Sequence, residues 1–198
     1  MLDRVRAFLF PPRMSKTLNL PNLLTLGRIL AIPVICWLLV AGGAELRWVA
    51  FALYVAAAVT DWLDGYLARK LNQGSPLGRM LDPIADKLLV LALLIVFAFT
   101  RDFSAWDLIP AIAIIIREVL VSGLREYLGP RNVVVHVTPL AKWKTTVQLV
   151  ALAIVVLEPL VPALAIVSDV ALWIAGLLTV WSGAQYFAGA WPRLVEEA

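Results

Sequence analysis

Six apolar runs, each close to the length that crosses a bilayer, divide this 198-residue sequence and constrain its fold more than any other feature. They cover roughly 23–41, 48–69, 82–100, 106–126, 144–160 and 165–188. A membrane-spanning helix needs about 20 mostly apolar residues, and the sequence lacks the alternating pattern of a membrane β-barrel. Hydrophobic residues make up 62% of the chain. The sequence therefore predicts an all-α, polytopic membrane protein that folds as a six-helix transmembrane bundle.

The basic residues are unevenly divided between the two ends of the predicted spans. Lysine and arginine are frequent in the N-terminal segment and in or beside residues 70–81 and 127–143, whereas the opposite connections carry only Arg47 and Arg101. By the positive-inside rule, the first set of segments and both chain termini face the cytoplasm. The net charge is only +3, and the cations are not arranged for nucleic-acid binding, so we expect no nucleic-acid partner.

One membrane domain accounts for nearly the whole chain. Residues 1–20 mix basic and apolar side chains and break at Pro11 and Pro12, which favours an interfacial amphipathic helix over a disordered basic tail. Residues 21–190 form the predicted six-helix domain. Residues 191–198 form a short cytoplasmic tail.

Four aspartates lie where the second and third predicted spans meet. Asp61 and Asp64 are three residues apart, and Asp82 and Asp86 are four apart, so each pair shares one helix face. The intervening segment, residues 72–76, is rich in turn formers, which favours a tight reversal between antiparallel helices. We therefore expect all four carboxylates to converge at one cytoplasm-facing site.

Such a cluster needs compensation by cations. Two like charges about 5 Å apart repel by roughly 3 kcal/mol at an effective dielectric constant of 20. Carboxylate oxygens suit Mg²⁺, Mn²⁺ or Ca²⁺, and two divalent ions would neutralise the cluster and hold a phosphorylated substrate. The simpler alternative is that Asp82 and Asp86 are first-turn acids stabilised by the helix dipole. That alternative leaves Asp61 and Asp64, near a helix C-terminal end, unexplained.

Small residues accompany the acids. Gly65 and Ala68 lie on the helix of the first pair, and Gly78 precedes Asp82 by four residues. Small residues in membrane helices allow close helix packing, and they also leave room beside the acids for a flat, bulky group. The sequence leaves both uses open.

These residues together form a recognisable string, D-x2-D-G-x2-A-R-x8-G-x3-D-x3-D. It runs through Asp61, Asp64, Gly65, Ala68, Arg69, Gly78, Asp82 and Asp86. This string resembles the signature of the CDP-alcohol phosphotransferase family, and every position is filled. The resemblance implies a homodimeric membrane enzyme that transfers a phosphoalcohol group from a CDP-linked donor to a hydroxyl and releases CMP.

The resemblance also implies roles for the matching residues. Asp61, Asp64 and Asp82 would bind two divalent metal ions, either Mg²⁺ or Mn²⁺. These ions would engage the CDP diphosphate. Asp86 would share a metal site and act as the general base. The nucleotide pocket would be lined by Gly65, Ala68, Arg69 and Gly78. We expect such an enzyme in the inner or plasma membrane of a bacterium, among membrane lipids.

Three further segments indicate the acceptor. Residues 19–34, 116–129 and 141–148 resemble the branch of this family that joins CDP-diacylglycerol to sn-glycerol 3-phosphate. We expect the acceptor phosphate to be bound by cationic and polar side chains in these segments, namely Arg117, Arg125, Lys142, Lys144, Thr145 and Gln148. The alternative is that the cations only set topology. Arg117 is the exception, because it lies further inside an apolar run, beside Glu118.

A polar stripe opens the first span. Asn22, Thr25 and Arg28 recur at a spacing of three residues, which places them on one helix face. They are either capping and snorkelling groups or contacts to the nucleotide and its diphosphate. We expect Asn22 and Thr25 to bind the CDP moiety.

Competing functions differ in what they require of the sequence. The same chemistry with inositol, inositol phosphate or serine as acceptor needs other pocket groups than those at 116–148. A divalent cation transporter would place its acids near the bilayer midplane, whereas these acids lie at one end of their helices. A non-catalytic membrane scaffold leaves the aspartate pattern unexplained.

Overall fold

The computed structural model describes residues 20–70, 76–129 and 139–195, without the side chains at 20–21, 62, 64–70, 79 and 139–142. This part of the chain is helical and contains no strand. Its long helices are α3 (Leu20–Ala41), α4 (Ala44–Lys70), α5 (Pro76–Thr100), α6 (Leu108–Leu128), α7 (Pro139–Leu157) and α8 (Ala165–Val195). Two short 3₁₀ turns, η2 (Glu158–Leu160) and η3 (Pro162–Leu164), join α7 to α8.

Each long helix covers one of the six predicted apolar runs, so the all-α prediction is confirmed. Four stretches in the described ranges are long and apolar enough to cross a membrane, namely those in α3, α5, α7 and α8. Charged residues interrupt the other two helices, Asp61 in α4 and the Arg117–Glu118 pair in α6. The chain is thus a polytopic membrane protein, and its six crossings stay a prediction.

The helix ends differ from the predicted boundaries at several places, and α5 and α7 begin at Pro76 and Pro139 instead of residues 82 and 144. The interfacial segment, residues 1–20, falls outside the described residues except for Leu20, which begins α3. At the other end, α8 continues to Val195, so the predicted tail at 191–198 starts inside a helix. Helix α8 is therefore longer than the apolar run from which it was predicted.

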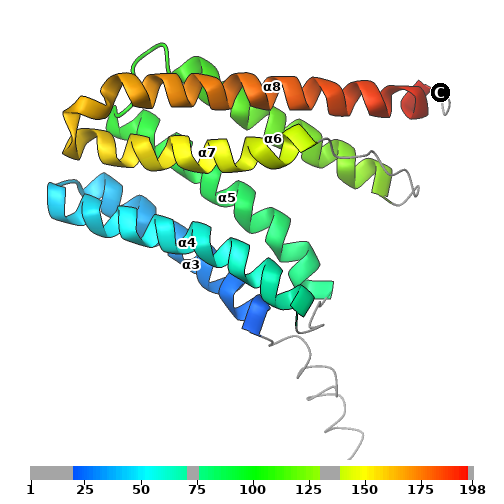
Figure 1. Cartoon of the computed structure of the whole chain (residues 1–198), viewed down its shortest axis with the longest axis horizontal. Helices are drawn as coiled ribbons and strands as arrows, with labels where there is room; N and C mark the ends of the chain where they lie inside the picture. The colour runs from blue at the N-terminus through cyan, green and yellow to red at the C-terminus, as the bar shows by residue number, and fades with distance from the viewer. Residues whose placement is uncertain (1–19, 71–75, 130–138, 196–198) are drawn as a thin grey trace, which may run out of the picture.

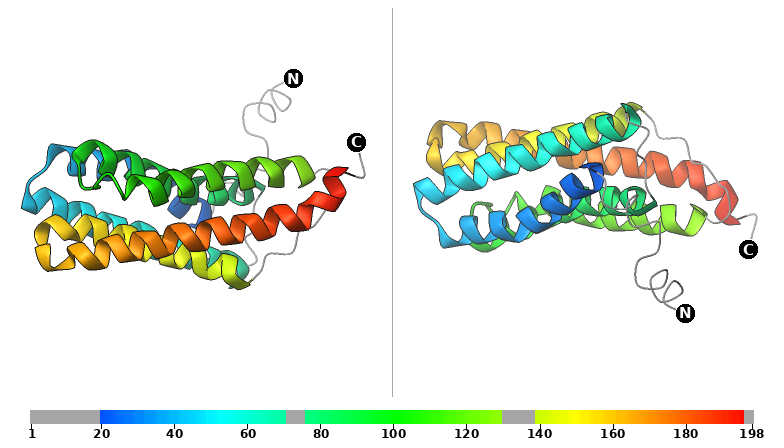
Figure 2. Two further views of the ribbon diagram at one scale, coloured as in Figure 1. Left: turned by 90° about the horizontal axis from the view of Figure 1, so that it is seen from above. Right: turned by 90° about the horizontal axis from the view of Figure 1, so that it is seen from below.

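A two-glycine connection reverses the chain between α3 and α4. Gly42 and Gly43 have φ values of 75° and 90°, in the left-handed region where a side chain is strained. This tight turn lays α4 back against α3, and the two helices run side by side in Figure 2. The first span pair is therefore a helical hairpin.

The helices form two groups that meet along one core. Helices α4 and α5 each pack against α3, while α6 and α7 each pack against α8, and α7 also contacts α4 and α5 (Figure 1). Helix α3 is the packing partner that α4 and α5 share. Side chains such as Ile35, Leu93 and Leu152 fill the core between the groups.

Two polar contacts stabilise the bundle, one between the two helix groups and one at the end opposite the aspartates. The Tyr54 hydroxyl of α4, only 1% exposed, donates to the Leu149 carbonyl of α7 at 2.7 Å. At the end opposite the aspartates, buried Arg47 makes a bidentate ion pair with Asp102 at 3.1 and 2.6 Å. Arg47 is therefore a structural cation as well as a contributor to the charge asymmetry of the sequence.

Candidate functional site

The polar stripe at the start of α3 faces the interior of the bundle. Asn22, Thr25 and Arg28 are 5%, 1% and 2% exposed, as expected for residues on one buried helix face. Thr25 donates its hydroxyl to Asp82 of α5 at 2.8 Å. The snorkelling alternative is wrong for Arg28, because the side chain turns inward rather than to the membrane surface.

Arg28 connects two of the predicted metal-binding aspartates. Its Nη1 lies 2.6 Å from Asp61 Oδ1 of α4 and 2.9 Å from Asp86 Oδ1 of α5. The arginine is buried, whereas the side chains of the two acids are 32% and 40% exposed. Sequence reasoning noted Arg28 but did not include it among the site residues. Its signal was the shared spacing with Asn22 and Thr25.

The position of the acids along α5 excludes the simpler explanation for one pair. Helix α5 begins at Pro76 and has no acidic residue in its first turn. Asp82 and Asp86 therefore lie beyond the reach of the helix-dipole effect, which fades within the first turn. Their contacts are with α3 instead, through Thr25 and Arg28.

The donor set around Arg28 suits a hard cation. Two carboxylates from different helices meet one cationic nitrogen, and their oxygens lie within about 5.5 Å of each other, the sum of the two contact distances. Carboxylate oxygens in such an arrangement are typical ligands of Mg²⁺ and Mn²⁺. Among the described side chains, no three of the usual metal-ligand types gather in one group. Asp64, the fourth predicted ligand, lies outside them, so the four-aspartate metal site stays a prediction.

The predicted nucleotide residues are described only in part. Gly78 is buried near the start of α5, close in sequence to Asp82, and Asn22 is buried in α3. The side chains of Ala68 and Arg69, and the surroundings of Gly65, are outside the described residues. The three described members of this set, Gly78, Asn22 and Thr25, lie on the helices that carry Asp86 or Arg28.

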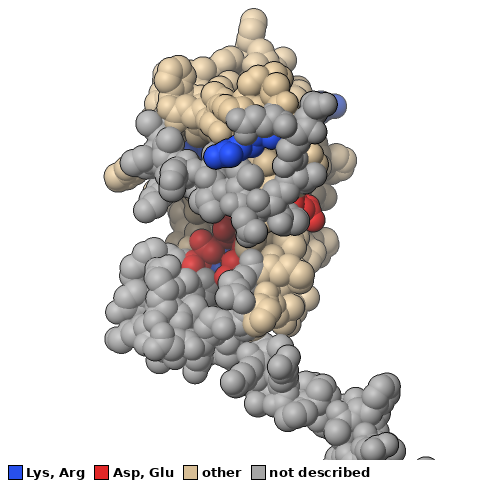
Figure 3. Space-filling model, turned by 90° about the vertical axis from the view of Figure 1, so that its right-hand side faces the viewer, with Lys and Arg blue, Asp and Glu red and all other residues tan. Residues whose placement is uncertain are grey.

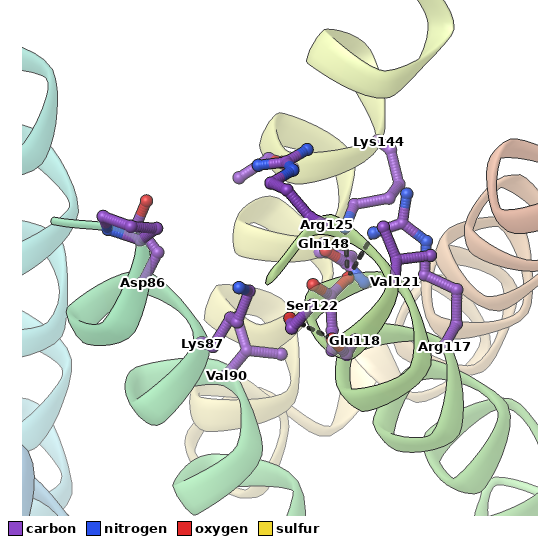
Figure 4. Close-up of a pocket in the computed structure, with 12 residues that line it drawn as sticks. Asp86, Lys87, Val90, Arg117, Glu118, Val121, Ser122, Arg125, Lys144 and Gln148 are labelled. Atoms are coloured by element: carbon purple, nitrogen blue, oxygen red, sulfur yellow. Dashed lines mark hydrogen bonds and ion pairs between the residues drawn. The ribbon is translucent and has the colours of Figure 1, made fainter. Parts of the chain in front are cut away.

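A second site, the basic cavity, lies between α5, α6 and α7. Its volume is about 170 Å³, and Figure 4 shows its lining. The polar side chains around it are Asp86, Lys87, Arg117, Glu118, Ser122, Arg125, Lys144, Thr145 and Gln148. Five of the six predicted acceptor residues are thus brought together, and the sixth, Lys142, has a side chain outside the described set.

Glu118 organises the cations of the basic cavity. It is 6% exposed and accepts from Lys144 Nζ of α7 and from Arg117 Nη1, the latter at 3.1 Å. Buried charges persist when they are paired and hydrogen-bonded in this way. The predicted neighbour relation of Arg117 and Glu118 is confirmed. Lys144, however, reaches the same carboxylate from a different helix, which the sequence did not indicate.

Two residues of helix α8 form hydrogen bonds with side chains that line the basic cavity. Arg117 Nη2 donates to Ser182 Oγ at 3.2 Å, and Gln148 Nε2 donates to Thr179 Oγ1 at 2.9 Å. Buried Arg117 Nε has no hydrogen-bond partner among the described groups. The arginine thus retains a donor for a further group, while its other nitrogens are held.

The basic cavity carries more positive than negative side chains. Four basic side chains, Lys87, Arg117, Arg125 and Lys144, line the cavity with two acids, Asp86 and Glu118. The excess of cations favours an anion such as phosphate, which arginine binds in bidentate fashion. Sequence reasoning did not assign Lys87, although its position next to Asp86 in α5 was a usable signal.

The acidic and basic regions open on the same end of the molecule. In Figure 3 acidic side chains lie inside a hollow on this end face, and basic side chains lie above them. Asp86 belongs to both regions, since it contacts Arg28 and also lines the basic cavity. A donor held by the acids and an acceptor held by the cations would therefore meet at Asp86.

Comparison with known proteins finds similar sequences with related names. A protein of Rickettsia bellii (strain RML369-C) named CDP-diacylglycerol–glycerol-3-phosphate 3-phosphatidyltransferase is 46% identical over 172 residues, which is 85% of this chain and 93% of that protein. A protein of the same name from Pseudomonas fluorescens is 41% identical over 183 residues, 89% of this chain and 92% of that protein. A rice protein named cardiolipin synthase (CMP-forming) is 38% identical and aligns with 93% of this chain but 61% of its own length.

The Rickettsia and Pseudomonas relatives are both named as phosphatidyltransferases, and a family model covers most of the chain. The model of the CDP-alcohol phosphatidyltransferases matches residues 18–181, a range that contains the aspartates and the basic cavity. The chain belongs to the CDP-alcohol phosphatidyltransferase family.

Proposed function

We propose that this membrane protein transfers the phosphatidyl group of CDP-diacylglycerol to sn-glycerol 3-phosphate, giving phosphatidylglycerol phosphate and CMP. The names of the relatives from Rickettsia and Pseudomonas support this activity. The observation that carries it is the double placement of Asp86. This residue shares Arg28 with Asp61 on one side and lines the basic cavity on the other.

The donor diphosphate binds at the aspartates in this proposal. Asp61, Asp64, Asp82 and Asp86 would hold Mg²⁺ or Mn²⁺, two ions in all. When bound, these ions polarise the phosphoryl oxygens and neutralise the charge that develops on CMP. Asn22 and Thr25 then contact the CDP moiety from α3, together with the small residues of the signature string.

The acceptor binds in the basic cavity with its phosphate toward the cations. Arg117 supplies a forked donor set, and Lys144, Lys87 and Arg125 supply further positive charge. Glu118 prevents the cations from repelling one another before the acceptor arrives. An acceptor without net negative charge, such as inositol or zwitterionic serine, would leave this excess charge uncompensated, which favours a phosphorylated one.

The reaction follows from the two sites. A hydroxyl oxygen of glycerol 3-phosphate attacks the phosphorus of the phosphatidyl group, and the bond from that phosphorus to the oxygen of CMP breaks. Asp86 accepts the proton of the hydroxyl, and CMP leaves with the bond electrons. A base acts when it lies within hydrogen-bond reach of the proton, and the position of Asp86 at the border of the two sites supports this role.

The orientation in the membrane is part of the proposal. The distribution of lysine and arginine supports a cytoplasmic location for both termini and for the end with the aspartates. A bacterial inner membrane would supply the lipid donor, and a soluble phosphorylated acceptor would enter from the cytoplasm. The family resemblance supports a homodimer, which cross-linking of the purified protein in detergent would detect.

The test is release of CMP by the purified protein in detergent. CMP and phosphatidylglycerol phosphate should appear only when CDP-diacylglycerol, glycerol 3-phosphate and Mg²⁺ or Mn²⁺ are all present. A product from inositol phosphate, inositol or serine would refute the acceptor assignment. A cardiolipin product would give the chain the activity named for the rice relative. If no acceptor yields CMP, the enzyme function is wrong, and Mg²⁺ uptake into proteoliposomes would then test the transporter alternative.

A further inference from the structure

Helix α8 passes unusually close to the side chain of Arg117. Gly183 of α8 is buried, and a Cβ atom built on it would lie 2.8 Å from Arg117 Cγ. The same Cβ would lie 3.5 Å from Nε and 3.7 Å from Cδ. Carbon atoms that are not bonded to each other prefer separations near 3.5–4.0 Å. A side chain at residue 183 would therefore require the Arg117 side chain or its surroundings to shift.

The far end of Arg117 is held by neighbours as well. Its Nη1 donates to Glu118 at 3.1 Å, and its Nη2 donates to Ser182 Oγ at 3.2 Å. Ser182 in turn donates its hydroxyl to the Thr179 carbonyl at 3.0 Å, which keeps its oxygen oriented. Consecutive residues of α8 thus set both the route of the side chain and the position of its guanidinium group.

We propose that Gly183 is a positioning residue for the acceptor, because it leaves the space that aims Arg117 into the basic cavity. Ser182 completes this role by fixing one nitrogen of the guanidinium. The inference deepens the proposed function and rests on it, since it takes the acceptor phosphate to be the ligand of Arg117. No residue of α8 was expected at the site from the sequence.

Substitution of Gly183 by alanine should displace the arginine rather than the helix. The contact falls on Cγ, near the base of the side chain, so relief requires a different rotamer that carries the guanidinium away. Bidentate recognition of phosphate depends on the direction of the forked donors. We expect Gly183→Ala to raise the KM for glycerol 3-phosphate about tenfold or more, with the KM for CDP-diacylglycerol unchanged.

Gly176 supplies a matched control on the same two helices. It lies two turns before Gly183 on α8, and its added Cβ would meet Pro110 of α6 at 2.6 Å from Cβ and 3.1 Å from Cα. Gly176→Ala should therefore lower the thermal stability without changing the KM for glycerol 3-phosphate in the folded protein. Gly123→Ala, which meets no atom within 4 Å, should change neither quantity.

A double-mutant cycle with Arg117 separates this inference from the function on which it rests. Arg117→Ala should raise the KM for glycerol 3-phosphate, and Gly183→Ala should add nothing in that background. If Arg117→Ala leaves this KM unchanged, the proposed acceptor site fails. If Arg117→Ala raises it but Gly183→Ala does not, or if the two effects add fully, the positioning role of Gly183 is refuted.

A second variant keeps the test decisive if Gly183→Ala does not fold. Ser182→Ala adds no volume and removes only the hydroxyl that accepts from Arg117 Nη2. It should raise the KM for glycerol 3-phosphate several-fold, leave the KM for CDP-diacylglycerol unchanged and have no effect in the Arg117→Ala background. An unchanged KM for glycerol 3-phosphate would overturn the claim that α8 positions the arginine.

Discussion

Replacement of Arg28 should make the stability of the protein depend on divalent cations. The buried guanidinium lies between Asp61 and Asp86, whose contacting oxygens are within about 5.5 Å of each other. Arg28→Gln removes the positive charge and leaves the two carboxylates facing each other. Their repulsion is about 3 kcal/mol at an effective dielectric constant of 20. Because both acids are partly exposed, screening reduces this figure to about 1–2 kcal/mol.

The measurement is thermal unfolding in detergent, with a chelator and then with Mg²⁺. A loss of about 1–2 kcal/mol corresponds to a fall in Tm of about 2–8 °C for a chain of this size. We expect this fall for Arg28→Gln in chelator, and we expect Mg²⁺ to restore most of it by taking the place of the lost charge. The wild-type protein should gain less from Mg²⁺, because Arg28 already compensates the acids.

Arg47 provides the matched control at the opposite end of the bundle. It is also a buried arginine, but its ion pair is with the single carboxylate of Asp102, which Thr100 also contacts through a hydrogen bond at 2.7 Å. Arg47→Gln should lower the Tm to the same extent with and without Mg²⁺. If Arg28→Gln behaves like Arg47→Gln, or is as stable as wild type in chelator, the aspartates do not share a cation and the proposed metal site is wrong.

Three further substitutions test other parts of the structure. Asp86→Asn should abolish CMP release while binding of CDP-diacylglycerol, measured by equilibrium binding in detergent, largely survives; loss of binding would mean that Asp86 mainly holds metal. Glu118→Gln should destabilise the protein by about 3 kcal/mol in denaturant unfolding, because it leaves Arg117 and Lys144 buried without their counterion; wild-type stability would contradict the central role of Glu118. Tyr54→Phe should cost about 1 kcal/mol through loss of its bond to α7, with both KM values unchanged, and a change in either KM would show that this contact reaches the site.

The sequence predicted the helices and the aspartate faces because both depend on local pattern. The apolar runs located all six helices, although α5 begins six residues before its run and α8 ends seven residues beyond its run. Spacings of three and four placed the acids on helix faces. The same rule identified the stripe of Asn22, Thr25 and Arg28. It did not indicate which helix the stripe meets, since a spacing defines a face but not its partner.

The side-chain partners within the site were not predicted, because they depend on contacts between helices that are distant in the sequence. Lys144 reaches Glu118 from 26 residues away, and Arg117 reaches Ser182 across 65 residues. The register of α6 against α8 follows from the fit of Pro110 to Gly176 and of Arg117 to Gly183, and periodicity within one helix carries no information about such a fit. Charged residues inside apolar runs were recognised as functional candidates, but their partners were not.

The division of the bundle into two helix groups explains how one chain brings a lipid donor and a soluble acceptor together. Helices α3, α4 and α5 supply Arg28 and the acids, whereas α6, α7 and α8 supply and support the cations that suit a phosphorylated acceptor. Helix α5 contributes to both, through Asp86 and its neighbour Lys87, and Thr145 of α7 lines both pockets as well. A base at this border can take the proton from an acceptor in one group while the phosphorus that is attacked stays in the other. In this proposal the adjacent Lys87 would offer a cation next to the base, on the same turn of α5.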